Sequence, residues 1–62
     1  MGEVEFLTVP EVAARLRVSL RTVYSLIERG DLHAIRVGRL LRVPLVSLEA
    51  YLRGERPKRE ED

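Results

Sequence analysis

The chain has 62 residues with no cysteine and a single histidine, which excludes disulfides and thiolate zinc sites. Its net charge at pH 7 is +1, and no stretch approaches the ~20 apolar residues of a membrane span. The first ten residues lack the basic start and apolar run of a signal peptide. We therefore expect one small cytoplasmic domain that uses no metal or cofactor and no membrane.

The charges are unevenly distributed along the chain. Residues 15–42 contain seven arginines and two acidic residues, a local net charge of +5, and the remaining acids lie on either side of this segment. Ten of the eleven basic residues are arginine, the side chain best suited to bidentate contacts with phosphates and base edges. Genome composition can explain a preference for arginine over lysine. The clustering favours a polyanionic partner.

The first predicted helix covers residues 9–16. Thr8 can cap its first turn, and Glu11, three residues later, can complete a capping box. Val12 and Leu16 follow at helical spacing and give the helix an apolar face.

The second predicted helix begins only two or three residues later. Ser19 is a good cap for its first turn, and Val23, Leu26 and Ile27 form an apolar stripe at spacings of three and four. Gly30 can adopt the left-handed conformation that ends a helix. Because so short a connection forces two helices to cross steeply, the pattern predicts a helix-turn-helix.

The period then changes to that of strands. Residues 33–37 and 41–43 alternate apolar and basic side chains, and Gly38 with Arg39 lies between them. This pattern predicts a two-stranded hairpin with its tip at these two residues.

Two registers of this hairpin are possible. A two-residue turn pairs Ile35 with Arg42, whereas a three-residue turn over residues 38–40 pairs Ile35 with Val43. The longer turn places the apolar side chains on one face and leaves Arg36 opposite Arg42 on the other. We predict the longer turn because a slip of one residue would bury a charge.

A third helix is predicted over residues 45–53, because Leu45, Leu48 and Leu52 recur at helical spacing. The fold class is therefore mainly α with a two-stranded β-hairpin, in the order helix, helix, strand, strand, helix. This is a winged helix-turn-helix. We assign the domain organisation as a flexible N-terminus at 1–5, the domain at 6–53 and a charged disordered tail at 54–62.

The candidate site follows from this fold class. In a helix-turn-helix the second helix enters the major groove, and its first turn meets base edges. Arg21 is predicted to contact guanine, and Arg39 at the hairpin tip to enter a minor groove. Hydroxyl side chains on the helix are predicted to bind phosphates. The predicted DNA-binding residues are Ser19, Arg21, Thr22, Tyr24, Ser25, Arg36, Arg39 and Arg42.

A family resemblance rests on residues 6–16, 18–24, 30–39 and 42–44, together with Leu48. These segments resemble the excisionase-type DNA-binding domains of the MerR-like winged helix-turn-helix group. The resemblance implies a recognition helix in the major groove and a hairpin on the backbone or minor groove. It also implies a role as an excisionase-like architectural factor or as a transcription regulator.

Catalysis is not expected, because the sequence shows no nucleophile with a base, no Gly-rich phosphate loop and no metal set. The alternative function is a protein-interaction adaptor on the same fold, docking to a polymerase, recombinase or toxin partner. It predicts weak salt dependence and an exposed apolar patch around Leu20, Leu40 and Leu45. A single module buries only about 600–1,000 Å² on DNA. The DNA-binding function therefore predicts self-association on adjacent sites, or support from a recombinase or polymerase partner.

Overall fold

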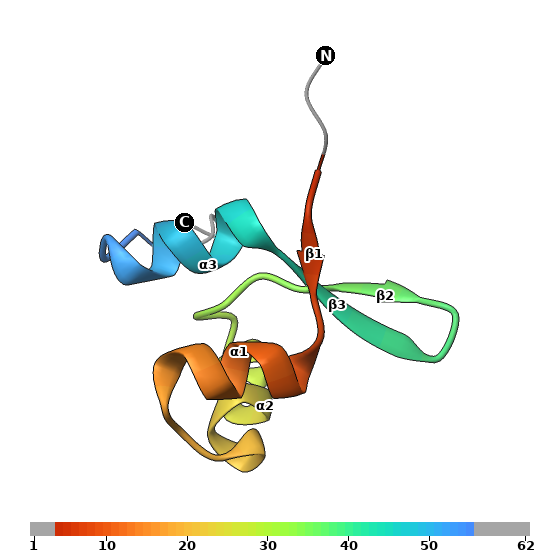
Figure 1. Ribbon diagram of the computed structural model, residues 1–62, viewed down its shortest axis with the longest axis horizontal. Coiled ribbons are helices and arrows are strands. Elements are labelled where there is room, and N and C mark those ends of the chain that lie inside the picture. Colours follow the sequence, from red (N-terminus) through yellow and green to blue (C-terminus); the bar gives the residue numbers. More distant parts are fainter. Residues whose placement is uncertain (1–3, 56–62) are drawn as a thin grey trace.

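The computed structural model describes residues 4–55 and contains three helices and three strands (Figure 1). In chain order they are β1 (Phe6–Leu7), α1 (Val9–Leu16), α2 (Leu20–Glu28), β2 (Ile35–Val37), β3 (Leu40–Pro44) and α3 (Leu45–Leu52). The strands form one antiparallel sheet in the order β1-β3-β2. Figure 1 shows the β2–β3 hairpin projecting to one side of the molecule, while α3 leaves the opposite end of β3.

The three predicted helices are confirmed. Thr8 caps α1 in an extended conformation, and the capping box with Glu11 is complete. Ser19 caps α2, where its hydroxyl accepts a hydrogen bond from the amide of Thr22. The predicted third helix ends one residue early, because Arg53 serves as its C-cap.

The turn between α1 and α2 depends on an unusual backbone conformation. Arg17 has φ 60° and ψ 46°, the left-handed region that favours glycine. Its amide and that of Val18 donate to the carbonyls of Ala14 and Ala13, at 3.3 and 3.0 Å. These bonds satisfy carbonyls in the last turn of α1 and direct the chain into α2, which begins after three intervening residues.

One apolar core joins all the elements except β2. Val12, Val23 and Val43 are completely buried and bring α1, α2 and β3 together. Leu32, in the connection after α2, is 1% exposed and Leu48 attaches α3. The other buried core residues are Leu7, Val9, Ala13 and Leu26.

The strand β1 was not predicted, so the expected two-stranded hairpin is instead part of a three-stranded sheet. Phe6 pairs with Pro44 and Leu7 pairs with Val43. The pairing continues into the start of α3, where the amide of Leu45 donates to the carbonyl of Glu5 at 2.8 Å. Two residues are too short to show an alternating pattern, and their partner lies far along the chain.

The predicted three-residue hairpin turn is wrong. The observed register pairs Ile35 with Arg42 and Val37 with Leu40, which leaves a two-residue turn at the tip. Gly38 has φ +63°, and a positive φ at the first central residue is typical of a tight II′ turn.

The observed register avoids the burial of charge that the prediction invoked. Antiparallel partners share a face of the sheet, so Arg42 lies on the face that carries Val37 and Leu40. Both of these apolar side chains are 55% exposed, which shows that this face of the hairpin lies outside the core. Arg36 therefore does not face Arg42 but pairs with Leu41.

The predicted flexible ends fall largely outside the described residues, which exclude 1–3 and 56–62. Val4, Gly54 and Glu55 are exposed and belong to no helix or strand. Within residues 4–55, no helix has the length and hydropathy that crossing a membrane requires.

Candidate nucleic-acid interface

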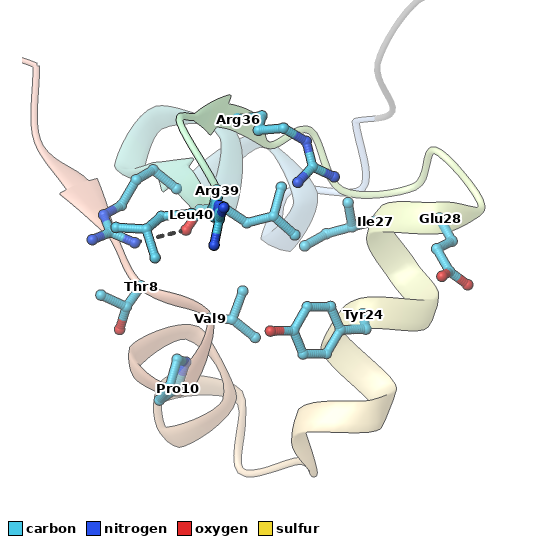
Figure 2. A pocket seen from close by; sticks show the side chains of 11 residues that line it. Thr8, Val9, Pro10, Tyr24, Ile27, Glu28, Arg36, Arg39 and Leu40 are labelled. Carbon is cyan, nitrogen blue, oxygen red and sulfur yellow. Dashed lines mark hydrogen bonds between the residues drawn. The ribbon is translucent and has the colours of Figure 1, made fainter.

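An open cleft of about 650 Å³ separates the β2–β3 hairpin from α1 and α2 (Figure 2). The start of α1 forms one wall through residues 8–10, and α2 forms another through Tyr24, Ile27 and Glu28. The hairpin forms the opposite wall with the side chains of Arg36 and of residues 39–42.

The hairpin places three cationic side chains along this cleft. Arg36, Arg39 and Arg42 all line it, and within residues 4–55 none of them makes an ion pair with a carboxylate. Arg42 is half-buried, and its Nη1 donates to the carbonyl of Leu41 at 3.0 Å. Glu28 also lines the cleft, but these three arginines outnumber it and form a cationic strip, which attracts anions.

Tyr24 extends from α2 into the same space. Its side chain is 45% exposed, and Figure 2 shows its ring directed towards Val9, with Arg39 and Leu40 on the hairpin side of the opening. The cleft thus combines an aromatic hydroxyl on the helix with guanidinium groups on the hairpin. Both kinds of group donate hydrogen bonds to phosphate oxygens.

Two predicted phosphate-binding hydroxyls already have partners in the helix cap. Ser19 Oγ accepts from the amide of Thr22 at 3.1 Å and lies 3.0 Å from Thr22 Oγ1. Because this bond satisfies an amide at the start of α2, its loss would weaken the helix. Their observed role is therefore local and structural.

Arg21 and Ser25 are exposed on α2 but do not line the cleft. They are four residues apart, so they share one side of the helix. The structure therefore brings together four of the eight predicted site residues, Tyr24 and the three hairpin arginines. The other four lie outside the cleft lining, three of them on α2 and Ser19 at its N-cap.

Sequence reasoning did not identify the start of α1 or Glu28 as part of this site. The capping box was visible in the sequence, but its position against the hairpin depends on the pairing of β1 with β3. Glu28 was counted only as a minority charge in a basic segment. Its place in the cleft lining depends on where the hairpin lies relative to α2, which the sequence does not show.

The Glu11 carboxylate, in the first turn of α1, interacts electrostatically with Arg42 of the hairpin. The pKa of Glu11 lies below its ordinary value of 4.5, chiefly because its carboxylate accepts the Thr8 amide. Arg15 and Arg42 add smaller effects in the same direction. No group of three or more potential metal-ligating side chains occurs among the residues that the structure describes.

Comparison with known proteins places the fold in a family. Residues 6–56 match the family described as "Helix-turn-helix domain". In Mycobacterium tuberculosis, the "Putative DNA-binding protein Rv0500A" is 56% identical over 42 residues, which are 68% of this chain and 54% of that protein. The chain thus spans about half the length of this relative. A comparison with solved structures finds no significant match.

Two further relatives differ in how much of their own length the chain covers. The "Uncharacterized protein YvgK" of Bacillus subtilis is 49% identical over 51 residues, which are 82% of this chain but 17% of that protein. A protein named "Excisionase" from Streptomyces ambofaciens is 39% identical over 51 residues, which are 82% of each chain. The match to the family covers most of the chain, and the chain belongs to the helix-turn-helix domain family.

Proposed function

We propose that the chain binds double-stranded DNA, with α2 in the major groove and the β2–β3 hairpin against the backbone or minor groove. This is the arrangement of a MerR-like winged helix-turn-helix. The observation that carries the proposal is the cationic strip of Arg36, Arg39 and Arg42, which faces α2 across an open cleft. The chain acts in this proposal by binding and not by catalysis.

The cleft gives the DNA backbone a defined position. A strand whose bases meet α2 must carry its phosphates past one side of that helix. The hairpin guanidinium groups and the Tyr24 hydroxyl lie on that side and supply the charge and donors for those phosphates. Arg21, exposed on α2 outside the cleft, remains free to meet a base edge, and guanine is its commonest specific partner.

The biological role that we propose is that of an excisionase-like architectural factor or a transcription regulator. The relative named "Excisionase", with 82% coverage of both chains, supports the first of these. A single module of this size buries about 600–1,000 Å² on DNA, which is small for tight specific binding. We propose that several copies occupy adjacent sites, or that a recombinase or polymerase partner stabilises the complex.

Fluorescence anisotropy with random-sequence duplex DNA tests the DNA-binding proposal. Affinity should fall steeply as salt rises, and Arg36→Ala and Arg39→Ala should each weaken binding and lower the salt slope by about one unit. Arg53→Ala is the matched control, because Arg53 lies after α3 and pairs with Glu55 at 3.1 Å. Absence of binding at low salt would overturn the proposal.

The adaptor function is the second candidate, and two exposed apolar side chains favour it. Leu20 is 46% exposed and Leu40 is 55% exposed, whereas Leu45, which was expected to join them, is half-buried. An adaptor that docks through these leucines would show little salt dependence. It would also lose its partner on Leu40→Ser while keeping it on Arg39→Ala.

A further inference from the structure

The first turn of α2 presents an exposed apolar side chain that lies outside the core cluster. Leu20 is the first residue of α2, and its side chain is 46% exposed. The apolar contacts that hold α2 in the core come from the buried Val23 and Leu26 on its other face. Leu20 is therefore not needed to attach the helix.

The neighbouring polar groups of this turn are already engaged. Ser19 and Thr22 use their hydroxyls on each other and on the Thr22 amide. The side chains of Leu20 and Arg21, by contrast, take no part in the cap of α2. One offers apolar surface and the other offers donors.

The position of Leu20 relative to the cleft follows from helical spacing. Leu20 and Tyr24 are four residues apart and lie on the same side of α2. Tyr24 lines the cleft, as Figure 2 shows, so Leu20 continues this face of the helix away from the hairpin. A DNA strand whose phosphates pass Tyr24 would bring the major-groove edges of its bases towards Leu20.

We propose that Leu20 is a specificity-determining residue that contacts the C5-methyl group of a thymine in the major groove. This inference rests on the proposed DNA-binding function. The thymine methyl is the apolar group that distinguishes this base in the major groove, and it is recognised by contact with apolar side-chain groups. Burial of both apolar surfaces on binding would favour thymine at one position. Arg21 beside it would favour guanine.

Replacement of thymine by uracil tests the proposal, because uracil differs only by the missing methyl group. A preferred site is first selected from a random pool with the wild-type protein, and each thymine in it is then replaced singly by deoxyuridine. At one position the replacement should weaken wild-type binding about fourfold, the value of one buried methyl-sized group. Leu20→Ala should bind the thymine and uracil forms of that site equally.

Two further variants keep the test decisive. Val46→Ala truncates an exposed apolar side chain on α3 and should retain the discrimination of the wild type. Leu20→Gln keeps good helix propensity and adds an amide suited to adenine. It should lose the discrimination between thymine and uracil, and it serves if Leu20→Ala fails to fold.

The outcomes separate this inference from the function on which it rests. If every uracil-containing site binds the wild type as tightly as the thymine site, Leu20 does not contact a thymine methyl, although DNA binding stands. The same conclusion follows if Leu20→Ala retains the discrimination. If the wild type binds no duplex at low salt, the DNA-binding function itself is wrong.

Discussion

Thr8 and Glu11 cap the start of α1 reciprocally. The amide of Thr8 donates to Glu11 Oε1 at 2.8 Å, and the amide of Glu11 donates to Thr8 Oγ1 at 3.1 Å. Thr8 also connects β1 to α1 and lines the cleft beside the hairpin. One local pair of hydrogen bonds therefore stabilises the helix and holds one wall of the candidate site.

Thr8→Ala should lower the free energy of unfolding by about 1 kcal/mol, because an amide in the first turn of α1 loses its acceptor. For a domain of this size, that corresponds to a fall in Tm of about 4–8 °C by circular dichroism. Thr8→Ser keeps the acceptor oxygen and should stay within about 2 °C of the wild type. Equal melting of the alanine variant and the wild type would show that the cap contributes nothing.

The capping box should make stability depend on acid. The folded pKa of Glu11 is lowered, so its contribution is present above its unfolded value, near 4.5, and is lost as pH falls through the folded pKa. At neutral pH the Tm of the wild type should exceed that of Glu11→Gln. Below about pH 4.5 it should fall towards the Tm of that variant. A difference in Tm that stays constant from pH 7 to pH 3 would contradict this linkage.

Arg17→Gly should stabilise the domain. Arg17 holds a left-handed conformation with φ 60°, which glycine adopts without the steric cost of a Cβ atom. Part of this gain is offset because glycine is more flexible in the unfolded chain. The free energy of unfolding, measured in urea, should therefore rise by about 0.5 kcal/mol. The matched change Arg15→Gly, inside α1, should cost about 1 kcal/mol. If both variants were destabilised equally, the left-handed conformation would carry no strain.

Glu28→Gln should tighten DNA binding. Glu28 lies at the rim of the cleft and repels the phosphates proposed to enter it. Removal of one such charge should raise affinity about threefold at low salt and progressively less as salt rises, because screening weakens the repulsion. Glu49→Gln on α3 makes the same change in net charge away from the cleft. Equal gains in both variants would indicate an effect of net charge alone.

The helices were predictable because their determinants are local. Thr8 and Ser19 lie directly before the helices that they cap, and glycine at position 30 has the positive φ that the pattern indicated. Each of these signals acts within four residues, the range of a helical turn. Sequence pattern and local geometry therefore agree for α1, α2 and α3.

The sheet was less predictable because its register depends on contacts between distant residues. The expectation that Val37 and Ile35 both face the core required the longer turn. In the structure the tip of the hairpin extends past the core, and Val37 and Leu40 are both exposed. Alternation alone cannot show how far a hairpin projects beyond the helices that cover its other end.

The candidate site was predicted in its residue types more than in its arrangement. The expected cations Arg36, Arg39 and Arg42 do line one cleft with Tyr24. Sequence could not show that the hydroxyl of Ser19 would be used by the cap of α2. Many serines at helix starts have this local bond, and a sequence alone does not reveal whether a hydroxyl has capacity left for a ligand.

The pairing of β1 with β3 has a consequence for the order of assembly. Phe6 pairs with Pro44, so strand β1 cannot find its partner until 38 further residues have been synthesised. The contacts between α1 and α2 span a much shorter stretch of chain and cost less loop-closure entropy. We expect the helical pair to form first and the sheet to close last, so that the hairpin acquires its place beside α2 only in the final step of folding.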